Sequence, residues 1–301
     1  MTDPATFTLL VFNGLSMGSI LLLVALGLAL SFGLMNIINL AHGEFIMVGA
    51  YTAYSIQQVA ISLTGDASPA ITYIISIPVA FLVAGFMGFV IERVIIRHLY
   101  GRSLDTLLAT WGVGLALQQL ARSIFGAPNV QVVSPGWLAG SIQVTDILVF
   151  PIKRIFIIVL AFVCVGGLFW YMYKTHWGRR TRAVMQNRQM AASLGVAANR
   201  VDGLTFALGS GLAGVAGCTL ALIGPIGPSM GTFHIVDAFM VVILGGMGQI
   251  SGAIVAALTI GMLNSLFEFS TNAVLGKVMV FAMIILFLQW KPNGLMQLSK
   301  R

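Results

Sequence analysis

The chain has 301 residues, of which 58% are hydrophobic and only 8% are charged. A soluble domain devotes about a quarter of its residues to charged side chains, so this composition excludes an ordinary water-soluble fold and indicates a polytopic membrane protein. The net charge of +7 does not indicate nucleic-acid binding, because twelve of the sixteen Lys and Arg residues fall within three stretches, 93–102, 174–200 and 291–301. The positive-inside rule predicts that these stretches are cytoplasmic.

The apolar runs are long enough to cross a membrane several times. A bilayer core about 30 Å thick needs roughly 20 apolar residues per helix. Candidate spans are 8–35, 43–62, 69–92, 106–125, 148–173, 203–223, 250–269 and 274–290. A shorter run at 235–246 is expected to form a broken or partial crossing. The predicted fold is an all-α polytopic membrane protein with about 8–9 transmembrane segments in one domain, 1–301, and with its N-terminus outside.

Polar residues and glycines interrupt two of the apolar regions, one near each end of the chain. Backbone that is not helical at membrane depth survives only where protein or a water-filled cavity satisfies it, and interrupted helices in both halves of a transporter indicate a substrate site. The alternative is that both interruptions are ordinary surface turns. The candidate pathway residues are Asn36, Asn39, His42, Glu44, Gly245, Gly246 and Gly248.

Glu44 is the most informative acidic residue. A carboxylate at the centre of a membrane helix costs about 2.5–3.5 kcal/mol on insertion scales, so it normally faces a cavity or a partner. Glu44 is also compatible with the first turn of the second span, where a carboxylate complements the helix dipole. Asp237 is predicted to be a similar helix-start acid, and Glu268 is predicted to lie near the end of a span, at the interface.

A basic segment at 176–202 predicts a short amphipathic helix that ends near Gly195. Small side chains such as Ala191 and Ala192 recur at helical spacing on its apolar face. An interfacial helix lying on anionic lipid would be an alternative, but a small-residue face suits docking into a protein groove better.

No catalytic motif is visible in the sequence. Gly276-Lys277 lacks the glycine spacing of a phosphate-binding loop, and no paired histidines indicate a zinc site. Cys164 and Cys218 fall inside apolar runs and are interpreted as small core residues. The chain is therefore predicted not to be an enzyme and to hold no cofactor, so any ATPase that drives transport must be another chain.

Several segments resemble the permeases of the hydrophobic amino-acid and amide branch of ABC importers. They are Ile37-Ile-Asn39-Leu-Ala-His-Gly-Glu44, the loop 178–196, Leu244-Gly-Gly-Met-Gly248 and Lys291-Pro-Asn-Gly294. The resemblance covers nearly the whole chain. Within this branch, Arg97-His-Leu-Tyr-Gly101, Leu107–Gly112, Leu117–Gln119 with Arg122, and Asn187–Ala192 look more like the urea permease than the branched-chain amino-acid permease.

The resemblance implies a permease domain that translocates urea or short amides, with branched-chain amino acids as the alternative substrate. A secondary transporter or channel, which would use intramembrane charges such as Glu44 as ion or proton sites, is the rival class. It also implies a second homologous permease, two ATP-binding subunits that hold ATP and Mg²⁺, and a periplasmic solute-binding protein, in the bacterial inner membrane. The loop at about 176–200 matches the coupling loop of the family. The residues expected to couple to the ATPase are Arg182, Ala183, Asn187, Ala191, Ala192 and Gly195.

Overall fold

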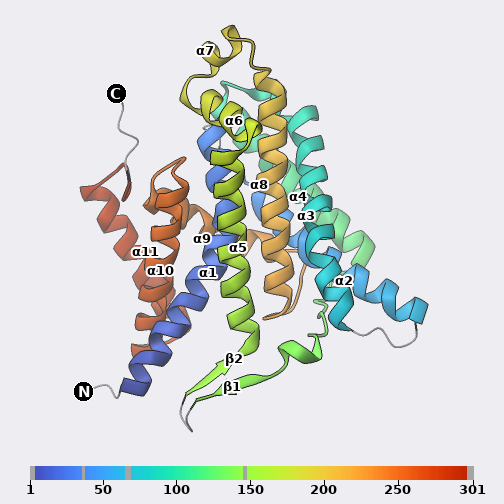
Figure 1. Ribbon diagram of the computed structural model, residues 1–301, viewed down its shortest axis with the longest axis vertical. Coiled ribbons are helices and arrows are strands. Elements are labelled where there is room, and N and C mark those ends of the chain that lie inside the picture. Colours follow the sequence, from blue (N-terminus) through green and yellow to red (C-terminus); the bar gives the residue numbers. More distant parts are fainter. Residues whose placement is uncertain (1–3, 36–37, 65–68, 145–147, 297–301) are drawn as a thin grey trace.

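The computed structural model describes residues 4–35, 38–64, 69–144 and 148–296, most of which are helical (Figure 1). The helices are α1 (Pro4–Met35), α2 (His42–Thr64), α3 (Pro69–Val94), α4 (Ser103–Phe125), α5 (Ile152–Lys174), α6 (His176–Gln186), α7 (Arg188–Ser193), α8 (Ala198–Ala221), α9 (Met230–Gly245), α10 (Ile250–Ser270) and α11 (Ala273–Trp290). Two 3-10 turns, η1 (Ile96–Leu99) and η2 (Gly136–Leu138), and the antiparallel strands β1 (Ser141–Gln143) and β2 (Val149–Pro151) complete the fold.

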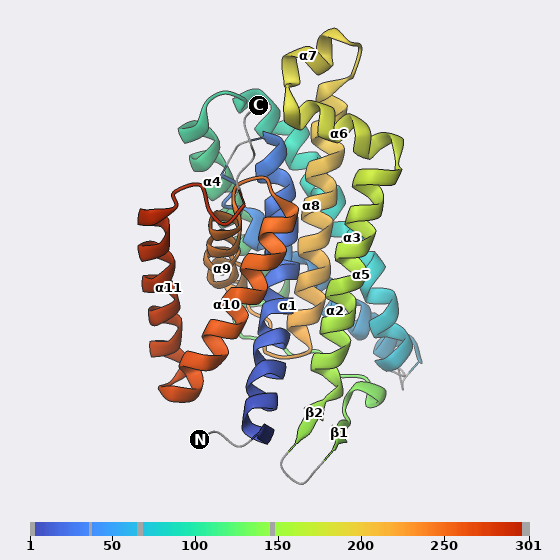
Figure 2. The same cartoon turned by 60° about the vertical axis from the view of Figure 1, so that its left-hand side comes forward.

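Helix α8 lies at the centre of the bundle, packed against α1, α2 and α3. Glycines bring these helices together at backbone distance. A Cβ atom at Gly27 would lie 2.0 Å from the carbonyl oxygen of Gly209, and one at Gly49 would lie equally close to that of Gly214. Small residues permit such close approach in membranes, where no hydrophobic effect drives helices together. By contrast, α11 is mostly exposed at the edge of the bundle (Figure 2).

The predicted all-α architecture is confirmed, but the number of spans is not. Each predicted apolar run coincides with one long helix, and the short run at 235–246 falls within α9, which has 16 residues. Six helices in the described ranges are long and apolar enough to cross a membrane: α1, α3, α5, α8, α10 and α11. The other two long helices, α2 and α4, contain more polar residues, including Glu44, Gln57, Gln118 and Arg122.

The two ends of the bundle differ in charge. Helices α6 and α7, which carry much of the basic stretch 174–200, lie at one end of the bundle, while the start of α1 and the strands β1 and β2 lie at the other (Figures 1 and 2). The start of α1 thus lies at the end opposite the basic stretch 174–200, and the side of the membrane that each end faces stays a prediction.

The predicted amphipathic helix in 176–202 is two helices, not one. Asn187 has an extended backbone, and its Oδ1 accepts a hydrogen bond from the Met190 N–H at 2.9 Å, so it ends α6 and caps the start of α7. Asparagine is a strong N-cap because its side chain replaces a missing helical acceptor. Gly195, with φ +84°, follows the end of α7 in the left-handed conformation that glycine favours there.

Candidate functional site

The break between α1 and α2 is held by a hydrogen bond within its own residues and by one to α4. Oδ1 of the buried Asn39 accepts a hydrogen bond from the Ala41 N–H at 3.0 Å, and the Leu40 N–H donates to Thr110 Oγ1 on α4 at 3.2 Å. Asn39 Nδ2 has no hydrogen-bond partner among the residues described. The predicted pathway residue Asn36 lies outside the described residues.

His42 begins α2 and connects it to α1. Its ring is buried, and Nε2 lies 3.1 Å from the carbonyl oxygen of Val24. Because a carbonyl oxygen can only accept, Nε2 carries the proton in this contact. A Cβ atom at Gly27 would lie 3.0 Å from the His42 ring, so the close packing of α1 defines the space for the imidazole. The contact of His42 with α1 is therefore structural.

Glu44 lies in the first turn of α2, as one of the two sequence interpretations predicted. It is buried, and its Oε1 accepts a hydrogen bond from Gln118 Nε2 on α4 at 2.8 Å. The same Nε2 donates to Thr232 Oγ1 on α9 at 2.9 Å. Glu44, Gln118 and Thr232 thus form a polar cluster where three helices meet. In the described ranges Glu44 Oε2 has no hydrogen-bond partner, and Thr232 is exposed, so the polar cluster is open on one side.

A cavity of about 250 Å³ lies at the start of α9, and its lining includes residues on both sides of Thr232 in the sequence but no member of the polar cluster. Its lining residues are Asn129, Pro225, Gly227, Ser229, Met230, Phe233 and His234. Arg122 lies one helical turn after Gln118 on α4 and is exposed. The polar cluster offers hydrogen-bond donors, acceptors and one carboxylate to a small polar solute, and its described residues include no paired nucleophile and base.

The second interruption of an apolar region, at 245–248, is a turn packed by glycines, and it lies far from Glu44. A Cβ atom at Gly252 would lie 2.0 Å from the Gly245 carbonyl oxygen, and Gly246 and Gly248 have positive φ values of 101° and 81°. Gly231, next to Glu44, is fourteen residues before Gly245 along α9, or roughly 21 Å at 1.5 Å per residue. The structure therefore does not bring the predicted glycines and Glu44 into one site.

The prediction that Asp237 starts a helix is wrong, because α9 already begins at Met230. Asp237 instead pairs with Lys277 of α11, whose Nζ lies 2.8 Å from Oδ1 and 3.1 Å from Oδ2. The pair ties the exposed α11 to α9. Glu268 does lie near the end of α10, half-buried, as predicted.

The predicted coupling residues separate into buried and exposed groups. Ala191 is buried against Val184, Ala198 and Val201 of the same chain, and Ala183 packs beside them. Arg182 stacks over the ring of Tyr173 at 4.6 Å. Asn187, Ala192 and Gly195 are exposed. Two apolar residues of this region that the sequence analysis did not select are also exposed, Met190 at 59% and Leu194 at 78%.

Sequence reasoning missed the partners of Glu44 as site residues. Gln118 belongs to a polar group on α4 with Gln119 and Arg122, and Thr232 is a polar residue in the apolar α9; these polar positions are the signal that could have found them. It also missed a network of buried charges around Glu92 and Asp202. The cysteines are free thiols, with Cys218 buried and Cys164 half-buried, in agreement with their interpretation as packing residues.

A bundle with six described helices of membrane-spanning length and composition is that of an integral, multi-pass membrane protein. Residues 10–288 match the family described as "Branched-chain amino acid transport system / permease component", and the chain belongs to this family. It is a permease subunit of the ABC type and not an enzyme, and ATP hydrolysis is carried out by separate subunits. No solved structure matches the chain significantly.

The relatives found by sequence comparison carry related names. The chain is 29% identical to the high-affinity branched-chain amino acid transport system permease protein BraD of Pseudomonas aeruginosa, over 94% of each chain. It is 30% identical to the corresponding protein LivH of Escherichia coli, over 95% of this chain and 94% of the relative. The chain is 26% identical to LivM of Escherichia coli, also named a permease protein of that system, over 93% of this chain and 68% of LivM. These names favour the amino-acid alternative over urea.

Proposed function

We propose that this chain is the transmembrane permease subunit of an ATP-driven importer for branched-chain amino acids in the bacterial inner membrane. The names of its relatives support this substrate class. The chain works with a second homologous permease, for which its similarity to LivM is the argument. Two ATP-binding subunits supply the ATP and Mg²⁺ sites, a periplasmic solute-binding protein delivers the substrate, and this chain itself holds no cofactor.

The substrate is proposed to pass the first turns of α2 and α9, and the polar cluster Glu44–Gln118–Thr232 is the observation that supports this path. One oxygen of the buried Glu44 has no partner among the described residues, and the cluster opens toward an exposed threonine. A buried polar atom without a partner is costly, so a solute donor that reaches Oε2 would remove this cost. The ammonium group of an amino acid is such a donor.

Urea is the second candidate substrate. Gln118 and Thr232 are uncharged hydrogen-bonding groups, which suit a neutral amide as well as an amino acid. The resemblance of the segments Arg97–Gly101 and Leu107–Gly112 to urea permeases also supports urea. A neutral solute brings no charge to be desolvated, whereas a zwitterion needs a partner for each of its charges.

Uptake of labelled leucine and labelled urea at micromolar concentration tests the substrate. We expect cells without this gene to lose leucine uptake and to regain it with the intact gene but not with Glu44→Ala. Loss of urea uptake with unchanged leucine uptake would replace the main proposal by the second candidate. Uptake of either solute by the purified chain without an ATPase would favour a secondary transporter or channel instead.

Helices α6 and α7 are proposed as the coupling segment that docks on an ATP-binding subunit. The exposed residues Met190, Ala192, Leu194 and Gly195 form the surface for this contact, because Ala191 is already covered within the chain. Closure of the two ATPase subunits on ATP would displace α7 and tilt the helices attached to it. The resulting motion would switch access to the polar cluster from one side of the membrane to the other.

A further inference from the structure

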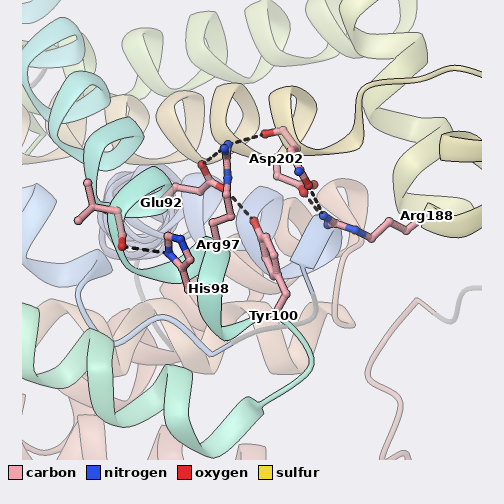
Figure 3. Close-up of polar contacts among 8 residues, drawn as sticks. Glu92, Arg97, His98, Tyr100, Arg188 and Asp202 are labelled. Atoms are coloured by element: carbon pink, nitrogen blue, oxygen red, sulfur yellow. Dashed lines mark hydrogen bonds and ion pairs between the residues drawn. The ribbon is translucent and has the colours of Figure 1, made fainter.

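Two buried carboxylates lie next to each other at the basic end of the bundle, where α3 ends and α8 begins (Figure 3). The side chains of Glu92, near the end of α3, and Asp202, near the start of α8, have no exposed surface. A Cβ atom at Gly203 would lie 2.9 Å from Glu92 Oε2, so the residue that follows Asp202 is in contact with Glu92. Buried carboxylates are costly unless they are paired.

The partners of Glu92 come from the connection between α3 and α4. Arg97 Nη2 in η1 lies 3.4 Å from Glu92 Oε2, and the Tyr100 hydroxyl donates a hydrogen bond to Glu92 Oε1 at 3.0 Å. Arg97 also donates to the main-chain oxygen of Asn199 on α8 at 3.1 Å. This connection is therefore joined to α8 as well as to α3.

The partner of Asp202 comes from α7. Arg188 Nη1 lies 2.5 Å from Asp202 Oδ2, and Arg188 Nη2 donates to Asn199 Oδ1 at 3.0 Å. The guanidinium group of Arg188 also lies over the ring of Tyr100, at 4.6 Å from its centre. Neither oxygen of Asp202 accepts a well-aligned hydrogen bond in the described part of the chain. The charge of Arg188 is thus the main compensation for burying this carboxylate.

Helix α7 has few other attachments to the bundle. It is six residues long, and Ala191 is its buried apolar residue, while Met190 and Leu194 face outward. Arg188 therefore connects an otherwise loosely held helix to α8 through Asp202 and to the α3–α4 connection through Tyr100. Arginine suits this position because its planar group stacks on an aromatic ring while its fork of donors reaches two acceptors.

We propose that Arg188 is the positioning residue that transmits displacement of α7 to α3 and α8, through its ion pair with Asp202 and its stacking on Tyr100. This inference rests on the proposed function, in which α7 contacts an ATP-binding subunit. The Arg188 side chain is 38% exposed, but its partner carboxylate is fully buried and would be left uncompensated if the pair separated. Displacement of α7 therefore makes α8 and the α3–α4 connection move with it. Without Arg188, the packing of Ala191 against Ala198 and Val201 would still join α7 to α8, but the link to the buried carboxylate and to Tyr100 would be lost.

The test uses Arg188→Gln and Asp202→Asn in the complete complex with its ATPases, second permease and binding protein, reconstituted in vesicles. Asp202 is fully buried, so its variant cannot disturb the docking contact directly. We expect both variants to assemble normally and to hydrolyse ATP, but to transport roughly tenfold less solute per ATP, within the usual range of coupling between sites. Arg188→Lys, which keeps the charge but loses the fork, should be intermediate.

Arg102→Gln is the matched control, because Arg102 pairs with Asp105 at 3.9 Å on the exposed surface two residues from Tyr100. Its solute-to-ATP ratio should equal that of the unmodified complex, since exposed ion pairs contribute little. Hydrogen–deuterium exchange of residues 187–196 adds a readout that needs no transport, and we expect faster exchange in Arg188→Gln.

Three outcomes would overturn the inference. An unchanged solute-to-ATP ratio in Arg188→Gln would mean that α7 transmits its motion by another contact. Loss of assembly in both Arg188→Gln and Asp202→Asn would make the ion pair a folding element only. An unmodified complex without ATP-driven uptake of leucine or urea would overturn the proposed function and the inference with it, which distinguishes this result from the first two.

Discussion

Gly231 makes room for the carboxylate of Glu44. A Cβ atom at position 231 would lie 2.8 Å from Glu44 Oε2 and 2.5 Å from the carbonyl oxygen of Gly43, so any side chain there would push α9 away from α2. The first turns of these two helices are in contact through their backbones. The position of the polar cluster therefore depends on a residue that has no polar side chain.

The Gly231→Ala variant should lose most of its transport. An added methyl group in a closely packed contact typically costs about 1–3 kcal/mol, and here it would also displace Glu44 from Gln118. Uptake and the amount of protein in the membrane are measured together. Gly166→Ala on α5 is the control, because a Cβ atom there meets nothing within 4 Å. Full uptake by Gly231→Ala would show that the contact of α2 with α9 can relax without harm.

Glu44→Ala should impair transport much more than assembly, and Glu44→Gln should be milder. The glutamine retains an oxygen that accepts from Gln118 Nε2, whereas alanine leaves that donor without its acceptor, at a cost of about 1–3 kcal/mol. Uptake is compared at equal abundance, with Glu268→Gln near the end of α10 as a control that should remain active. Normal uptake by Glu44→Ala would leave Glu44 with a role only in starting α2.

Leu194→Glu should weaken binding of the ATP-binding subunit while leaving the chain folded, because Leu194 is 78% exposed in this chain. Loss of one buried leucine contact corresponds to about 1.5–3 kcal/mol, or at least a tenfold weaker association, which co-purification and titration would measure. Ala191→Trp should instead reduce the amount of folded protein, because Ala191 packs against Val184 and Val201. The opposite pattern, with Ala191→Trp abundant but unable to bind, would restore Ala191 to the docking surface.

Lys277→Met should loosen α11, because it leaves the carboxylate of Asp237 without its partner. Removing one partner of a buried ion pair costs about 3–5 kcal/mol of stability. Lys277 is partly exposed, so we expect a loss near or below the lower end of this range. The double variant Asp237→Asn with Lys277→Met should recover much of the lost thermal stability, since no charge remains unpaired. Equal stability of the single and double variants would mean that the pair does not hold α11 to α9.

The positions of the long helices could be predicted because each is an apolar run of membrane length. The start of α2 was also predictable, since Glu44 has the chemistry expected of a first turn. The break at Asn187 was not predicted, because helical spacing continues across it and only the capping bond of its side chain reveals the interruption. Asp237 was misplaced because α9 begins with Met230 and Gly231, which give no acidic start signal.

The contacts of the candidate site could not be predicted, because they join residues far apart in the chain. The hydrogen bond between Glu44 and Gln118 spans 74 positions, and that between Gln118 and Thr232 spans 114. Hydrophobic periodicity identifies the apolar face of one helix but not the helix that faces it. The neighbours of the glycines at 245–248, which are Gly252, Gly33 and residues 293–296, could not be predicted for the same reason, and the assignment of these glycines to the pathway stays a prediction.

The glycine contacts of α8 also determine which amino-acid substitutions the protein can tolerate. Any replacement of Gly209 or Gly214 adds at least one methyl group, and the space for it is already occupied by the backbone or side chains of a neighbouring helix. A core leucine has substitutes of similar volume, whereas glycine has none. Saturation mutagenesis should therefore show these positions as fully intolerant, while the exposed leucines and valines of α11 exchange freely. The least variable part of this transporter would then be the residues that have no side chain.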